Sequence, residues 1–126
     1  MTASVLLTFA LFLASALVHL TGARLCDGYC RTLTWRSPLP MLVLLAALFV
    51  LHVIAALIFT GGFVIGENWG LGGFDKETAI GWMDVFYFSL INITTLGLGD
   101  IYPTGHLRFM AGIESLTGFL LISISG

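Results

Sequence analysis

Three long apolar stretches constrain this chain more than any other feature. They cover residues 2–21, 39–60 and 107–126, and each comes close to the roughly 20 residues that a helix needs to cross a bilayer. Of the 126 residues, 58% are hydrophobic and 10% are charged, which leaves too little polar surface for a soluble domain. The sequence therefore predicts an all-α integral membrane protein with three transmembrane helices. The net charge of -2 gives no reason to expect a nucleic-acid partner.

The two segments that connect these stretches differ in charge. Residues 22–38 hold three arginines and one aspartate, whereas residues 61–105 hold five acidic residues and one lysine. Because basic loops stay in the cytoplasm, we expect the N-terminus outside the cell and the C-terminus inside it. The first stretch lacks the basic start of a secretory signal, so we interpret it as a retained helix. Cys26 and Cys30 have no further ligand nearby, and we expect two reduced thiols in a short loop.

A fourth apolar segment, residues 81–94, is too short to cross the membrane and is typical of a re-entrant helix. Gly97 and Gly99 follow it, and Pro103 comes soon after, so the helix must end near the threonines. Backbone that leaves a helix at membrane depth has to line a cavity or an ion path. Glycine takes positive φ without penalty, which allows a Thr-x-Gly-x-Gly strand to point successive carbonyl groups one way. Rings of such oxygens from four strands replace the water around a dehydrated cation.

These residues carry a family resemblance. The run Thr94-Thr95-Leu96-Gly97-Leu98-Gly99-Asp100, then Tyr102-Pro103 and an apolar helix, resembles the pore domain of potassium channels, whose usual signature is Thr-Val-Gly-Tyr-Gly-Asp. The match is to the bacterial two-helix type, with an extra N-terminal transmembrane helix and basic loop over residues 1–38. The pore domain would be residues 39–126, divided into an outer helix (39–60), a turret (61–80), a pore helix (81–94), a filter (95–100) and an inner helix (105–126).

The resemblance implies a homotetramer in a bacterial-type cell membrane, embedded in lipid, that passes monovalent cations and needs no cofactor besides permeant K⁺. Potassium would bind in rings of oxygens supplied by Thr95, Leu96, Gly97 and Leu98, with Gly99 closing the outer mouth. The implied supports of the filter are Asp100 behind that mouth, Thr94 at the inner end and the aromatic pair Tyr87 and Phe88.

Three positions depart from the family pattern. Leu98 replaces the tyrosine whose hydroxyl ties the filter to its surroundings, and Leu96 replaces valine. Ile91 stands where some bacterial members carry a glutamate that pairs with the filter aspartate. These changes leave a second hypothesis open, that of a weakly selective monovalent cation channel.

Glu114 and Gly118 lie within the third long stretch. A carboxyl group inside a membrane helix is costly and indicates a function by default. We expect Glu114 to form hydrogen bonds behind the filter near Asn92 and Thr94, the alternatives being a place in the ion cavity or one facing lipid. Gly118 matches the hinge glycine of the family's inner helix, or provides space for helix packing.

Two further hypotheses concern proteins that do not conduct ions. Gly97-Leu98-Gly99-Asp100 also fits the Gly-x-Gly-Asp signature of intramembrane aspartyl proteases, which need a second carboxyl group in another membrane helix. The remaining aspartates, at positions 27, 75 and 84, do not lie within a predicted span. An accessory membrane subunit would have no need for Thr-x-Gly-x-Gly. The sequence thus favours a channel over an enzyme.

Overall fold

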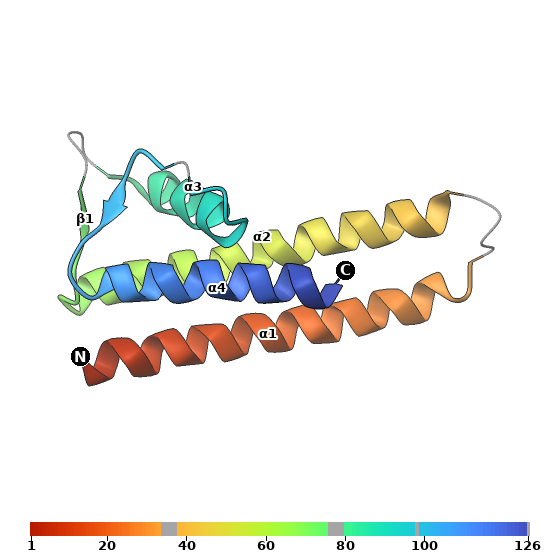
Figure 1. The fold of residues 1–126 in the computed structure, drawn as a ribbon, viewed down its shortest axis with the longest axis horizontal. Helices are drawn as coiled ribbons and strands as arrows, with labels where there is room; N and C mark the ends of the chain where they lie inside the picture. The colour runs from red at the N-terminus through yellow and green to blue at the C-terminus, as the bar shows by residue number, and fades with distance from the viewer. Residues whose placement is uncertain (34–37, 76–79, 98, 126) are drawn as a thin grey trace.

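The computed structural model describes residues 1–33, 38–75, 80–97 and 99–125 (Figure 1). Three of its helices are long and apolar enough to cross a membrane, which confirms the predicted fold class. The elements are α1 (Thr2–Cys30), α2 (Leu39–Asn68), β1 (Phe74–Asp75), α3 (Trp82–Ile93), β2 (Tyr102–Pro103) and α4 (Leu107–Ser125).

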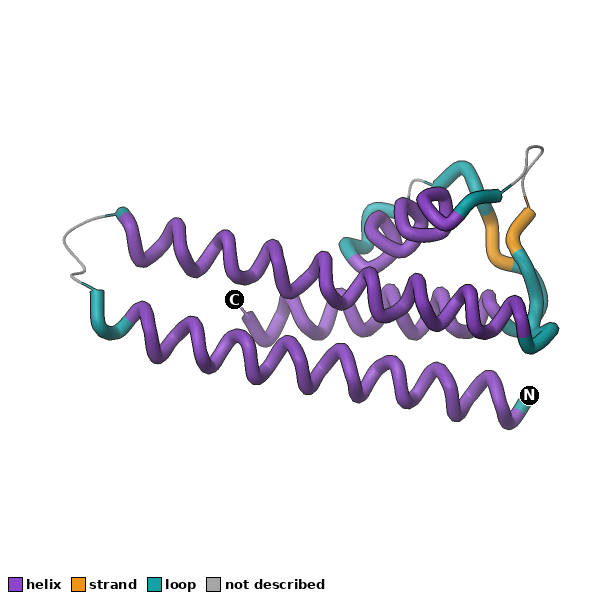
Figure 2. Tube along the Cα trace, turned by 180° about the vertical axis from the view of Figure 1, so that it is seen from behind, coloured by secondary structure: helices purple, strands orange, loops and turns teal. Residues whose placement is uncertain are grey.

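The helices are arranged around the antiparallel pair α2 and α4. Helix α1 packs along one side of this pair, and the short helix α3 lies on the other side (Figure 1). The view from behind shows the same arrangement, with the N-terminus at the end of the bundle that carries the two short strands (Figure 2). Within the described part of the chain, α1 contacts α2 and α4 but not α3. The extra N-terminal helix is therefore attached to the outside of the predicted pore domain.

Helix α1 is longer than the sequence predicted. We expected a loop from residue 22 onward, but the helix continues to Cys30, so both cysteines lie on a helix and not in a loop. Gly22 does not interrupt it, because its missing side chain makes room for Leu51 of α2. Near the end, the guanidinium group of Arg31 pairs with the Asp27 carboxylate at 2.9 Å, one helical turn away.

Helix α2 also extends beyond its predicted end. It begins with Pro40 in its first turn, a position that suits proline. We expected it to end at residue 60, but it continues through Gly61-Gly62 to Asn68. The reason is packing: a Cβ atom on Gly62 would collide with Leu11 of α1, so this glycine serves as a contact surface between helices. The loop that we predicted for residues 61–80 consequently begins only at Trp69.

The strands β1 and β2 attach this loop to the segment that precedes α4. They pair antiparallel, with Phe74 opposite Pro103. Beyond them, the Thr104 amide donates to the Gly73 carbonyl and the His106 amide to the Leu71 carbonyl, both at 2.7 Å. The chain between α3 and α4 is thereby fixed at its outer end, and α4 starts directly afterwards.

Candidate ion-conducting site

Helix α3 ends where the predicted filter begins. Its first turn is capped by the Asp84 carboxylate, which accepts a hydrogen bond of 2.8 Å from the Gly81 amide. Its apolar face, including Val85 and Ile93, is buried against α2 and α4. The C-terminal end of a helix carries a partial negative charge, and here that end points at residues 94–97. This helix matches the predicted pore helix to within one residue at each end.

The segment after α3 folds back onto the last carbonyl groups of that helix. The amide of Thr95 donates to the Asn92 carbonyl at 3.0 Å, and those of Leu96 and Gly97 both donate to the Ile91 carbonyl, at 3.0 and 3.3 Å. Two of these residues have left-handed backbone conformations, Thr95 with φ 61° and Gly97 with φ 66°. All three are exposed in the single chain.

The amide groups of Thr95, Leu96 and Gly97 donate hydrogen bonds, but their carbonyl oxygens accept none from the described residues. The donors of the segment are therefore directed into the chain, while its acceptors remain available to a ligand. We call residues 95–97 the exposed carbonyl strip.

The outer half of the predicted filter has an apolar backing. Leu98 lies outside the described residues, and Gly99 packs against Ile91 and Phe88 without a positive φ. Behind the strip is a small cavity of about 70 Å³, lined by Phe88, Ile91, Asn92, Gly97, Gly99, Ile101 and Tyr102. Ile91 thus places a hydrocarbon side chain at the position where the resemblance would allow a carboxyl group.

The two aromatic residues predicted to support the filter, Tyr87 and Phe88, have different surroundings. Phe88 is buried and makes edge-on ring contacts with Phe63 and Phe74, with centroids 5.6 and 5.3 Å apart. Tyr87 is half exposed and stays outside this cluster. Asp100 is exposed, and the described residues of the same chain give its carboxylate no hydrogen bond or ion pair. Its predicted bracing role therefore has no partner within one chain.

Glu114 contacts Asn92 of α3, as the sequence indicated, but not Thr94, whose hydroxyl donates to the Leu90 and Ile91 carbonyls. The Glu114 side chain is fully buried, with an exposure of 0%. One carboxyl oxygen is hydrogen bonded to the Ser89 hydroxyl, and the other accepts a hydrogen bond of 2.7 Å from the Asn92 amide group. The same amide group donates to the Ala111 carbonyl at 2.8 Å. The network joins α3 to α4 immediately before the exposed carbonyl strip.

Counting protons in this network indicates that Glu114 is neutral. The Ser89 oxygen lies 2.8 Å from the Ala56 carbonyl of α2 and also contacts the Glu114 carboxyl group. A hydroxyl has one proton, and a carbonyl cannot donate. Both contacts are satisfied if Glu114 donates its proton to Ser89 and Ser89 donates its own to the Ala56 carbonyl. A buried carboxyl group without a cationic partner is expected to keep its proton.

Gly118 is a point of close contact between α4 and α3. A Cβ atom at this position would overlap with the backbone carbonyl of Ile93, the last residue of α3. The glycine thus allows α4 to touch the end of the pore helix. This contact supports the packing interpretation of Gly118, whereas the hinge interpretation remains a prediction.

Sequence reasoning missed Ser89 and the Ala56 carbonyl. A signal for Ser89 was present, because Ser89 and Asn92 are three residues apart and therefore share one face of an otherwise apolar helix. The Ala56 carbonyl could not be found in advance. It already accepts from the Thr60 hydroxyl within α2, and it meets Ser89 only because of where α3 crosses α2.

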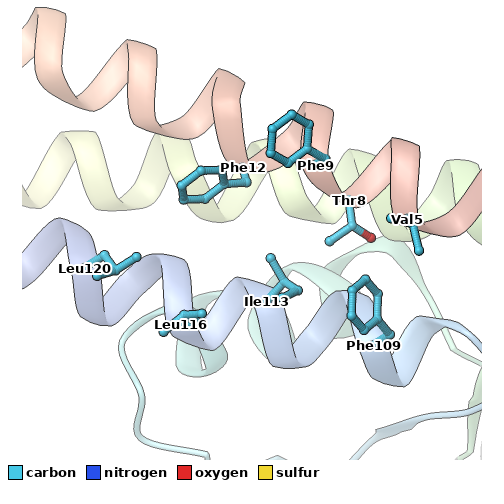
Figure 3. Close-up of a pocket in the computed structure, with 8 residues that line it drawn as sticks. All are labelled: Val5, Thr8, Phe9, Phe12, Phe109, Ile113, Leu116 and Leu120. Carbon is cyan, nitrogen blue, oxygen red and sulfur yellow. The ribbon is translucent and has the colours of Figure 1, made fainter.

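A groove between α1 and α4 is a separate feature. It has a volume of about 240 Å³, and Figure 3 shows its lining: Val5, Thr8, Phe9, Phe12, Phe109, Ile113, Leu116 and Leu120. The single polar group among these side chains, the Thr8 hydroxyl, donates to the Ser4 carbonyl within α1. An apolar lining of this kind offers an ion no ligand, so the conducting path has to be sought at the exposed carbonyl strip.

Three apolar spans and a re-entrant helix that ends in a strip of free carbonyl groups define an integral membrane protein of the pore-forming class. The chain belongs to an ion channel family, since a family model described as "Ion channel" matches residues 41–125. The match covers the three helices α2, α3 and α4 almost completely and leaves out α1. No curated protein and no solved structure matches the chain.

Proposed function

We propose that the chain is one subunit of a potassium-selective channel, in which four copies surround an ion path lined by residues 95–99. The exposed carbonyl strip carries this proposal. Its amide groups are bonded to α3, its carbonyl oxygens accept no hydrogen bond from the described residues, and the negative end of α3 lies beside it. Dehydrated K⁺ needs oxygen ligands of this type, at Thr95, Leu96, Gly97 and Leu98, and one chain supplies a single strand of them.

Glu114 is proposed to support the filter from behind. It binds α3 at Ser89 and Asn92, and the Asn92 carbonyl in turn accepts the amide of Thr95. Two hydrogen bonds, Glu114–Asn92 and Asn92–Thr95, therefore connect α4 to the first residue of the exposed carbonyl strip. A change in the position of α4 would reach the filter through this connection.

The alternative is a channel that selects weakly among monovalent cations. Two observations favour it: the apolar side chain of Ile91 behind the outer half, and the lack of a partner for Asp100 among the described residues of one chain. A filter whose outer half is held by hydrocarbon contacts alone would adapt more easily to a smaller ion. For either version, we propose an N-terminus outside the cell and a C-terminus in the cytoplasm, on the basis of the arginines at positions 24, 31 and 36.

Reversal potentials of the purified protein in planar bilayers test the proposal. With K⁺ on one side and Na⁺ on the other, we expect the reversal potential to follow the K⁺ gradient. A value near zero would favour the weakly selective channel, and the absence of current would refute both versions.

Gly97→Ala is the matching variant for this experiment. Nothing lies within 4 Å of a Cβ atom on Gly97, so alanine would not clash within the chain. It would instead strain the left-handed backbone by about 1–2 kcal/mol, and we expect loss of selectivity or of current. Gly61→Ala, in an open position on helix α2, is the control and should behave as the unchanged protein.

A further inference from the structure

A second buried polar cluster lies at the far end of α4, away from α3. His19 of α1 is 1% exposed, and its Nε2 atom lies 2.6 Å from the Ser125 hydroxyl of α4, across 106 positions of sequence. The imidazole rings of His19 and His52 meet edge to face with centroids 5.1 Å apart. The cluster therefore joins α1, α2 and α4 at one point.

The partners of the two rings determine where their protons lie. The Ser125 hydroxyl donates its proton to the Leu121 carbonyl at 2.7 Å, so it accepts from His19, and Nε2 of His19 carries a hydrogen. Nδ1 of His52 lies 2.7 Å from the Leu48 carbonyl, which only accepts, so this nitrogen also carries a hydrogen. In the neutral rings, Nδ1 of His19 and Nε2 of His52 therefore carry no hydrogen and can only accept a hydrogen bond.

Both of these nitrogens are buried, and neither has a hydrogen-bond partner among the residues that the structure describes. A buried acceptor without a donor is unfavourable, and a second one beside it doubles the cost. The ligand that relieves such a pair most simply is a proton, which turns one of the two acceptors into a donor.

Among the residues that the structure describes, no carboxylate faces the two rings to balance the charge of added protons. Among the described residues, the titratable group that faces His19 is His52 of α2, while α4 contributes only the Ser125 hydroxyl. Protonation of both rings would place two like charges in an apolar contact between three helices. This arrangement is unstable, and α1 must then separate from α2 and α4 or admit water.

We propose that His19 and His52 form a proton-binding site that controls how firmly α1 holds the end of α4. With no proton or one proton added to the pair, the His19–Ser125 hydrogen bond stays in an apolar contact, and protonation of both rings loosens that contact. The consequence for ion flow rests on the proposed channel function, because α4 is the inner helix of that channel.

The ring protons test the site without any need for conduction. In protein with isotope-labelled histidine in detergent micelles, NMR at alkaline pH should show the Nδ1–H tautomer for His52 and the Nε2–H tautomer for His19. On acidification the two should change together, and His52→Gln should shift the titration of His19. His106, which is exposed directly before the opposite end of α4, provides the reference signal. Independent, solvent-like titration of His19 and His52 would overturn the proposal.

Ion flux into liposomes tests the regulation. Between about pH 8 and pH 5.5, the range in which histidine titrates, the flux should change, and this change should be lost in both His19→Gln and His52→Gln. His106→Gln is the control and should keep it. A chelator in all buffers removes Zn²⁺, which two imidazoles can also bind. If the flux of the two variants still follows pH like that of the unchanged protein, the regulation is refuted; if no variant conducts at all, the channel function fails while the NMR result still decides the site.

Discussion

At the scale of single residues, the position of Glu114 shows how a carboxyl group is accommodated inside a membrane helix. The described residues give it no cationic partner, and its two oxygens are matched by one hydroxyl and one amide group from the same face of α3. The carboxyl group therefore works as a neutral donor and acceptor, a role that requires its shape and hydrogen bonds but not its charge.

This leads to a prediction with two substitutions at one position. Glu114→Gln should keep the fold and the conduction, since the amide can donate to Ser89 and accept from Asn92. Glu114→Leu has a similar volume but leaves both groups unpaired, at a cost of about 1–3 kcal/mol for each. Thermal unfolding in detergent and single-channel recording measure the difference. Equal losses in the two variants would show that a charged carboxylate is required.

Gly118 offers a second prediction, which separates packing from hinge motion. Gly118→Ala would press a methyl group against the Ile93 carbonyl and should destabilise the protein by about 1–3 kcal/mol, as overpacking usually does. Gly112→Ala on the same helix is the control, because nothing lies within 4 Å of its Cβ position. Unfolding temperatures measure this effect. Unchanged stability with altered gating in Gly118→Ala would favour the hinge.

At the scale of elements, glycine was the residue most easily misread from the sequence. We expected the first helix to end at residue 21 and the second before Gly61-Gly62, yet Gly22 and this glycine pair lie inside helices. Gly22 makes room for Leu51 and Gly62 for Leu11 of the neighbouring helix. Such a role depends on how the helices pack against one another, which the local sequence does not show. The short helix α3, in contrast, was predicted almost to the residue, because aspartate at its start and glycines beyond its end are local signals.

The packing role of Gly62 can be tested against its direct neighbour. Gly62→Leu would displace Leu11 and push α1 away from α2, whereas Gly61→Leu points into open space. Both changes alter helix propensity in the same way, so a difference between them reports the contact alone. We expect Gly62→Leu to destabilise the attachment of α1 by about 1–3 kcal/mol, seen as faster proteolysis of the α1–α2 connection. Equal rates in the two variants would mean that Gly62 does not hold α1 in place.

At the scale of the whole molecule, the number of spans and the family could be predicted from apolar length and from the motif at residues 94–100. The attachment of α1 could not. Its buried face carries Ser4, Thr8, Ser15 and His19. The Ser4 and Thr8 hydroxyls are satisfied by carbonyl groups of the same helix, whereas His19 has its partners on α2 and α4, which the sequence of α1 alone does not reveal. Sequence reasoning likewise found Glu114 from its charge, but found neither the hydroxyl nor the carbonyl that complete its network.

The exposed carbonyl strip leads to the last prediction, that of the assembly. One chain presents its free carbonyl oxygens on an open surface, where water would bind them, and a cation can lose its water only if other strands close around it. Helix α1 does not contact α3, so it leaves room on that side for further copies. We expect the native mass of the detergent-solubilised protein in K⁺ to be four times that of the chain. Replacement of K⁺ by a large organic cation should weaken the tetramer, because the strands then face one another without the ion that neutralises their oxygens. A conducting monomer or dimer would contradict the arrangement, since neither can surround an ion with rings of carbonyl groups.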